Sequence, residues 1–105
     1  MKVIYQKSNK NKVWFDLEVS EVDSKISIPA GKFYLQGKEY DLPEVKDLDF
    51  PIGSRLYIEK TDTGADYLVD YTGLAIPNSF GEGIGAPLIA WNDGEIKVLK
   101  HVEEG

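Results

Sequence analysis

The strongest constraint on the fold is a strict alternation of side chains in Val13–Val19. Apolar residues occupy the odd-numbered positions, whereas Trp14, Asp16 and Glu18 occupy the even-numbered ones. A period of two residues indicates a β-strand with one buried face, because successive side chains of a strand point to opposite sides of the sheet. The pattern therefore predicts a half-buried strand with Trp14 on its outer face, beside two carboxylates.

Short extended segments recur along the rest of the chain, separated by turn residues. The other predicted strands are 2–6, 25–28, 32–35, 38–42, 54–60, 66–71, 88–91 and 95–102. Gln36-Gly37 and Asn92-Asp93-Gly94 are typical of β-hairpin turns, because glycine adopts positive φ without steric cost, and the polar stretch 7–12 suits a hairpin loop. We expect a single all-β domain over residues 1–105, a small β-sandwich or barrel of about eight or nine short antiparallel strands joined by hairpins.

The main interruption of this pattern is Pro43–Pro51. Because proline is tolerated in the first turn of a helix, we predict at most one short helical turn, near 43–49. The next two segments, Ser54–Lys60 and Asp66–Tyr71, flank a polar turn at 61–65. They are predicted to lie in the middle of a sheet.

The charge of the chain argues against binding to nucleic acid. Its 18 acidic and 12 basic residues give a formal net charge of −6, and Arg55 is the only arginine. Nucleic acid binding depends on neutralising phosphates with Lys and Arg, so an acidic chain is a poor candidate. No apolar stretch approaches the ~20 residues that span a membrane, and no secretory signal follows Met1. We therefore expect no membrane partner and a cytoplasmic or virion location.

The residue types that usually carry catalysis or bind metals are scarce. The chain has no cysteine, which excludes disulfides, thiolate catalysis and cysteine-ligated zinc. His101 is the only histidine, so one chain cannot build a metal site mainly from imidazoles, and we interpret this residue as a structural or surface histidine. We predict that the protein is not an enzyme.

Two motifs resemble known ligand-binding sites, but the residues that these sites also require are not present. Residues 81–86 fit the G-x-G-x-x-A spacing of dinucleotide sites, but Pro87 and a strand-like run follow where that motif requires a helix. A calcium loop of the EF-hand type starting at Asp62 would place Tyr67 where glycine is required. We predict no cofactor, no bound metal and no catalytic residue.

Aromatic side chains and one loop are the candidates for a contact surface. Trp14, with Asp16 and Glu18, is suited to stack on a sugar ring or to anchor a protein contact, unless a neighbouring segment covers it. Trp91 is a second candidate. The Gly/Pro-rich loop Thr72–Pro87 is long for a connection, and such loops are often binding loops. Its candidate contact residues are Phe80, Gly81, Glu82, Gly83 and Ile84.

Three functional hypotheses follow. The first is a non-catalytic structural or assembly module of a multi-subunit particle, such as a small phage virion or tail accessory protein, with a protein partner or self-association. The second is a carbohydrate-binding module that uses its tryptophans and tyrosines. The third is an acidic regulatory protein that binds and inhibits a partner with a basic surface.

Overall fold

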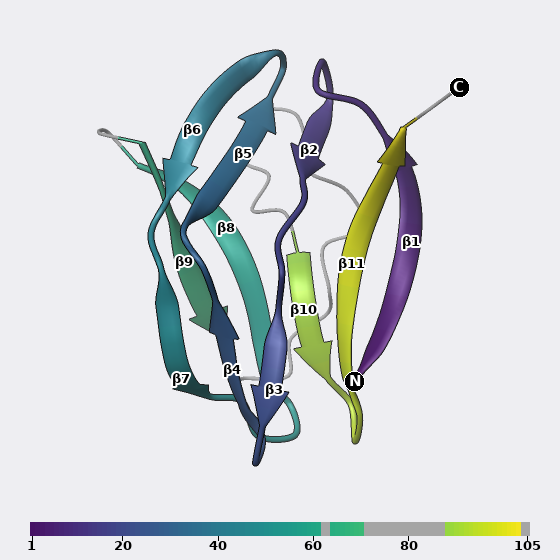
Figure 1. Cartoon of the computed structure of the whole chain (residues 1–105), viewed down its shortest axis with the longest axis vertical. Helices are drawn as coiled ribbons and strands as arrows, with labels where there is room; N and C mark the ends of the chain where they lie inside the picture. Colours follow the sequence, from purple (N-terminus) through teal and green to yellow (C-terminus); the bar gives the residue numbers. More distant parts are fainter. Residues whose placement is uncertain (62–63, 71–87, 104–105) are drawn as a thin grey trace.

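The computed structural model describes residues 1–61, 64–70 and 88–103, and these ranges contain strands and no helix (Figure 1). The prediction of a single small all-β sandwich or barrel is confirmed. The eleven strands are β1 (Lys2–Ser8), β2 (Val13–Phe15), β3 (Ser20–Val22), β4 (Lys25–Ile28), β5 (Gly31–Leu35), β6 (Lys38–Leu42), β7 (Val45–Asp49), β8 (Arg55–Thr61), β9 (Gly64–Asp70), β10 (Leu88–Asn92) and β11 (Ile96–Glu103).

One layer is a five-stranded sheet in the order β1-β11-β10-β8-β9. Neighbouring strands are antiparallel except for β1 and β11, the first and last strands of the chain, which run parallel from Lys2 beside Lys97 to Ser8 beside Glu103 (Figure 1). The prediction of a hairpin at 7–12 is therefore wrong. The stretch turns the chain, but β2 belongs to the opposite layer, because β1 is already paired with β11.

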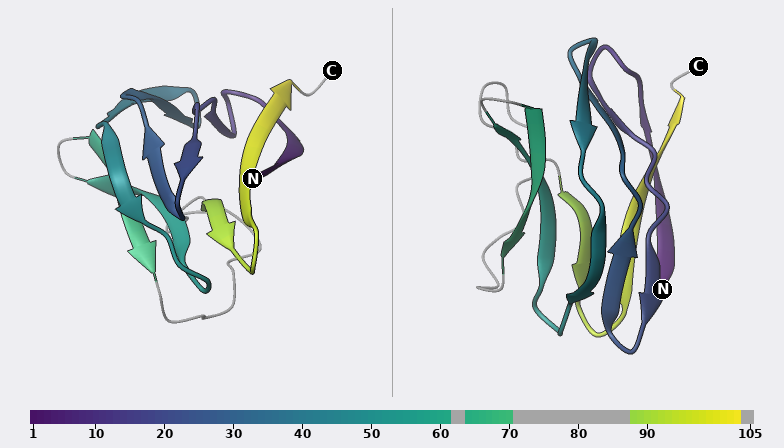
Figure 2. Two further views of the ribbon diagram at one scale, coloured as in Figure 1. Left: turned by 60° about the horizontal axis from the view of Figure 1, so that its bottom comes forward. Right: turned by 60° about the vertical axis from the view of Figure 1, so that its left-hand side comes forward.

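The opposite layer consists of two three-stranded sheets, β2-β5-β6 and β3-β4-β7, through which the chain passes in turn (Figure 2). Gly31 pairs with Leu42, and Ile28 pairs with Val45, in one continuous register. Pro29 and Pro43 lie in the gaps between these pairs, where a residue without a backbone N–H breaks the ladder. The layer is thus three long, bent strands, each divided in two, which explains why the structure has more strands than predicted.

The region near 43–49, for which at most one short helical turn was predicted, forms a strand and no helical turn. This segment contains β7, which pairs antiparallel with β4. Val45 and Leu48 are half-buried and pack against the core, and Asp47, with φ at 51°, forms a bulge whose N–H donates to Ser27 Oγ at 3.0 Å. Cross-strand pairing satisfies more backbone groups here than an isolated helical turn could.

The hairpin turns follow the expected chemistry. Gln36 and Gly37 both have positive φ, at 52° and 83°, as a type I′ turn requires. Asp23 and Ser24 form a second turn of this kind between β3 and β4, with φ of 52° and 63°. Of the two strands expected in mid-sheet, β8 lies between β9 and β10, but β9 lies at the end of the described sheet order.

The core lies between the two layers and contains the apolar face predicted for Val13–Val19. Phe15 is fully buried, Leu17 is buried and Val19 packs against the same cluster. The remaining buried members are Val13, Ile26, Ile28, Phe33, Leu42, Phe50, Leu56, Ile58, Ile89, Ala90, Ile96 and Val98. Burying a side chain of this size stabilises the fold by about 1.5–3 kcal/mol.

Candidate contact surface

Trp14 lies on β2, where this strand approaches β11 of the other layer. Its ring centroid is 5.7 Å from that of His101, and the side chain is half-buried. The next residue, Phe15, points into the core and contacts the same imidazole at 4.2 Å between centroids. The imidazole of His101 therefore packs against both a core side chain, Phe15, and a partly exposed indole, Trp14.

His101 joins the two layers through a hydrogen bond with the backbone of β2. Its Nδ1 accepts a hydrogen bond from the Phe15 N–H at 3.2 Å, so Nε2 carries the proton of the neutral ring. Nε2 is buried and has no hydrogen-bond partner within residues 1–61, 64–70 and 88–103, and burial lowers the pKa of the imidazole to about 4. The interpretation of His101 as a structural residue agrees with this geometry.

Asp16 and Glu18 lie on the exposed side of the same segment, beside Lys100 of β11. Lys100 Nζ donates to Glu18 Oε1 at 3.1 Å and lies 3.8 Å from Asp16 Oδ1. The hydrogen bond to Glu18 is the main cause of a raised pKa of Lys100. Both carboxylates are largely exposed, so each pair stabilises the fold by about 0–1 kcal/mol.

Tyr5 completes this surface. It is directly opposite Lys100 in the parallel pair β1–β11, and its side chain is exposed. We call the set Tyr5, Trp14, Asp16, Glu18 and Lys100 the Trp14 surface. The set combines two aromatic rings with carboxylate acceptors and an ammonium donor, which suits reversible binding of a polyhydroxylated or polar ligand.

Tyr5 and Lys100 were missed by reasoning from the sequence. The position of Tyr5 beside Lys100 depends on the parallel pairing of the two terminal strands, whose residues lie about 95 positions apart in the chain. The only available signal was the alternation around Trp14, which identifies one face of one strand.

Trp91 is not part of this surface. It is half-buried on β10, and its cross-strand neighbours are Lys97 and Arg55. Lys97 and His101 are four residues apart on β11, roughly 13 Å along an extended strand. Trp91 is therefore a separate candidate contact residue.

The remaining candidates, Phe80, Gly81, Glu82, Gly83 and Ile84, lie outside the described residues. Within residues 1–61, 64–70 and 88–103, no three His, Asp or Glu side chains are grouped as a metal site would require. The same ranges contain no helix long and apolar enough to cross a membrane.

Comparison of the sequence with known protein families and with curated proteins finds no match. A solved structure does share the fold, namely the crystal structure of the gene 22 product of the Bacillus subtilis SPP1 phage. The two match with a TM-score of 0.65 at 14% sequence identity, over 100% of this chain and 98% of the phage protein. At this identity, the likeness is one of fold.

Proposed function

We propose that this protein is a non-catalytic structural or assembly module of a phage particle and acts through protein–protein contacts. The observation that carries the proposal is the match in fold to a phage gene product over essentially the full length of both chains. Because the two chains are covered almost end to end, the likeness concerns the whole architecture rather than a common pair of sheets.

The chemistry of the described residues is compatible with this role. The only histidine, His101, is buried between the two layers and accepts a hydrogen bond from the Phe15 N–H. The exposed charged groups form pairs such as Lys32 with Asp41 and Lys25 with Asp49, typical of solvated strand surfaces.

The test is to tag the chain in the genome that encodes it and to purify particles on a density gradient. We expect the chain to sediment with the other particle proteins in a fixed stoichiometry, measured by quantitative mass spectrometry. Deleting the gene should yield particles that are incomplete or not infectious. Recovery of the chain only in the soluble fraction, with normal particles after deletion, would contradict the proposal.

Carbohydrate binding is a second candidate, favoured by the Trp14 surface. A partly exposed indole with adjacent carboxylates can stack on a sugar ring and accept hydrogen bonds from its hydroxyls. A glycan array with the wild-type chain and with Trp14→Ala tests it. Binding that is lost in Trp14→Ala and retained in Trp91→Ala would support this candidate, and an array with no binding by wild type would remove it.

A further inference from the structure

Strand β1 is attached to the molecule differently from the other four strands of its sheet. Its extensive contacts with described strands are with β11, along the parallel register from Lys2 beside Lys97 to Ser8 beside Glu103. Within the described residues, no side chain of β1 belongs to the hydrophobic core or packs against it, whereas each of the other four strands contributes to that core. β1 is therefore held mainly by one ladder of backbone hydrogen bonds.

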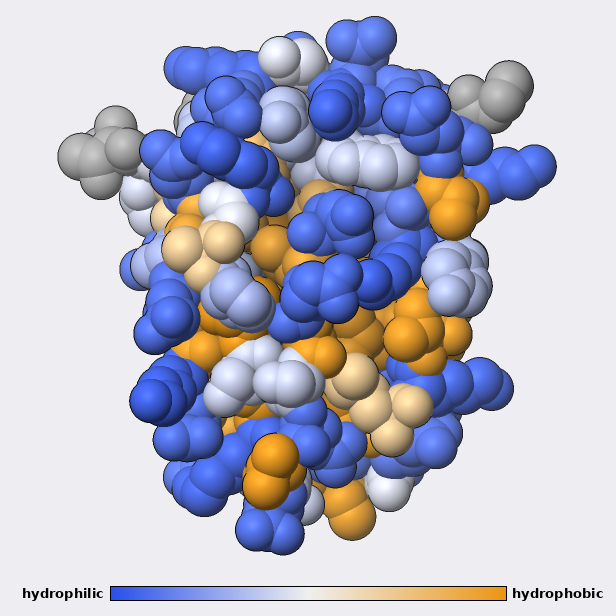
Figure 3. Space-filling view, viewed as in Figure 1, coloured by the Kyte–Doolittle hydropathy of each residue, from blue (hydrophilic) through white to orange (hydrophobic). Residues whose placement is uncertain are grey.

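The apolar side chains of β1 lie near the surface. Tyr5 is 65% exposed, and Val3 and Ile4 are half-buried. On the neighbouring strand, Val102 is exposed as well. Figure 3 shows hydrophobic side chains reaching the surface on the side of the molecule where Figure 1 draws β1 and β11. Because these side chains lie outside the core, detaching β1 would leave the core intact.

Strand β11, in contrast, is fixed in place independently of β1. Ile96 and Val98 are buried in the core, and Leu99 packs against it. His101 accepts the N–H of Phe15 from the opposite layer, and β10 pairs with the other edge of β11. The edge of β11 that β1 occupies is therefore a preformed row of backbone donors and acceptors, which can pair with an extended strand.

The chain is anchored where β1 ends. Ser8 is buried, and its Oγ donates a hydrogen bond to the Val13 carbonyl. The Gly37 N–H donates to the Lys10 carbonyl at 2.8 Å, which fixes the following loop to the β5–β6 turn. A movement that releases β1 from β11 would therefore be confined to residues 2–7, with Ser8 as the pivot.

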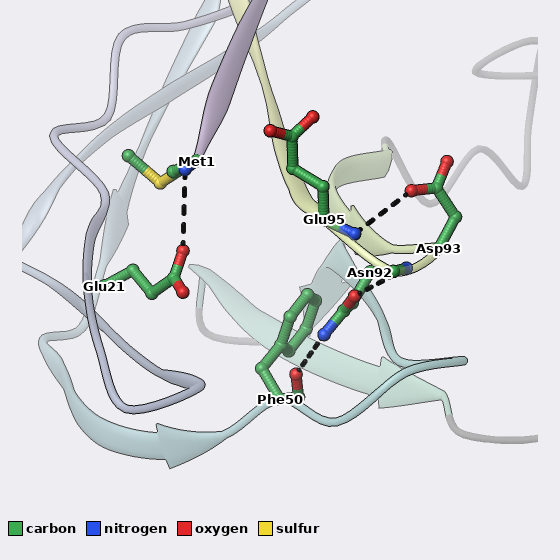
Figure 4. Close-up of polar contacts among 7 residues, drawn as sticks. Met1, Glu21, Phe50, Asn92, Asp93 and Glu95 are labelled. Atoms are coloured by element: carbon green, nitrogen blue, oxygen red, sulfur yellow. Dashed lines mark hydrogen bonds and ion pairs between the residues drawn. The ribbon is translucent and has the colours of Figure 1, made fainter.

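The other end of β1 is held by a long ion pair. The Met1 ammonium lies 3.8 Å from Glu21 Oε1 (Figure 4), and both groups are partly exposed, so this pair contributes little. The turn between β10 and β11 is held more firmly in the same view. There Asn92 Nδ2 donates to the Phe50 carbonyl at 2.7 Å, and both side chains are buried.

We propose that β1 exchanges between copies of this chain, so that β1 of one copy pairs with β11 of a second copy in the same parallel register. The inference deepens the proposed assembly function, on which its biological role rests, by naming a second copy as a partner. The register selects this occupant, because β1 of another copy makes the same contacts with β11 that β1 makes within its own chain. Exchange of an identical element is a low-cost route to association.

Exchange should be weak and slow. Within one chain, β1 is tethered beside β11 at a high effective concentration, so pairing between copies should require a high local concentration, such as exists in a growing particle. β1 must also detach before it can pair with a second copy. Sub-denaturing urea, which favours local opening, should therefore accelerate exchange, whereas it should weaken a contact between two intact surfaces.

The absence of native cysteine allows a direct test with single cysteines in the full chain. Tyr5 and Lys100 are directly opposite each other in the β1–β11 pair, at a spacing that a disulfide can bridge. Tyr5→Cys and isotope-labelled Lys100→Cys are mixed at high concentration in sub-denaturing urea, diluted and oxidised. We expect mixed disulfide dimers to outnumber same-variant dimers, and mass spectrometry of proteolytic peptides should locate the bond between positions 5 and 100.

The matched control mixes Lys32→Cys with Asp41→Cys. These residues are also exposed, and they are directly opposite each other in the β5–β6 pair. β5 and β6 bury Phe33 and Leu42 in the core, so neither strand should exchange. The control should therefore give no excess of mixed dimers.

A locked variant tests whether association requires release of β1. Tyr5→Cys/Lys100→Cys, oxidised at low concentration, ties β1 to β11 of its own chain. Sedimentation velocity at high protein concentration should detect dimers of the wild type and only monomers of the oxidised variant, and reduction should restore its dimers. Thermal unfolding of each variant verifies that it folds.

Mixed dimers that are no more frequent than in the control would overturn the proposal. An excess of Tyr5→Cys dimers over mixed dimers would also overturn it, because intact sheets would then meet at the outer edges of β1. A chain that does not exchange but is found in purified particles would overturn this inference alone. Exchange by a chain that is absent from particles would contradict the proposed function and leave this inference intact.

Discussion

The two faces of the segment Val13–Val19 differ in what they contribute, although they are built from alternating residues. On the inner face, Phe15 is fully buried against His101 and its N–H is held by the imidazole. On the outer face, Trp14 is half-buried, and Asp16 and Glu18 meet Lys100 in solvent. The inner face should therefore determine stability, while the outer face should contribute little to it.

Of the substitutions that test this comparison, Phe15→Ala should lower the free energy of unfolding most. Removing a fully buried ring leaves a cavity beside His101 and should lower the free energy of unfolding by about 3–5 kcal/mol. Urea denaturation followed by tryptophan fluorescence measures this loss. Val22→Ala, a truncation at an exposed apolar site, is the control and should change stability by about 0.5 kcal/mol or less. Equal losses for the two variants would contradict the assignment of stability to the inner face.

The second-largest effect should come from low pH, which should reduce the contribution of His101 to the free energy of unfolding. The folded pKa of His101 is about 4, below the ordinary value of 6.5, so the unfolded chain binds a proton more readily between these values. This contribution to stability is complete above pH 6.5 and is lost as the pH falls toward 4, by about 3 kcal/mol.

His101→Asn is the matched control for the effect of pH, because an amide oxygen can accept the Phe15 N–H without titrating in this range. The difference in unfolding free energy between wild type and His101→Asn should therefore change between pH 7 and pH 4.5. A difference that is constant with pH would show that His101 does not carry this dependence.

Trp14→Ala should have an intermediate effect. The half-buried indole loses its contact with His101, which should cost about 1–2 kcal/mol, and the fold should persist. The ring signals of His101 in NMR spectra should shift, because the indole lies beside the imidazole. Trp91→Ala serves as the control and should leave these signals in place. A shift of equal size in both variants would contradict the separation of the two tryptophans.

Lys100→Gln should have the smallest effect on stability. Its pairs with Glu18 and Asp16 are exposed, so the expected loss is below about 1 kcal/mol and should shrink further at high salt. Urea denaturation at two salt concentrations measures it. A loss above about 2 kcal/mol would show that the outer face also determines stability and would remove the contrast between the two faces.

The sequence predicts which side of one segment carries the candidate surface. It does not predict all the residues that form this surface. The alternation in Val13–Val19 places Trp14, Asp16 and Glu18 together on one side, which the structure agrees with. The same alternation contains no information about the strand that lies beside it. Lys100 and His101 come from the far end of the chain, so their roles depend on packing between layers.

The sequence by itself determined the local features of this protein. The period-two pattern specifies extended chain with a buried face, and Gln36-Gly37 specifies a tight hairpin, because both depend on backbone sterics within a few residues. Only the tertiary structure decided that β1 pairs with β11, that 45–49 is a strand and that His101 connects the two layers. These outcomes depend on contacts between segments distant along the chain, where the free energy of burying shared apolar surface and pairing backbone groups outweighs any local preference.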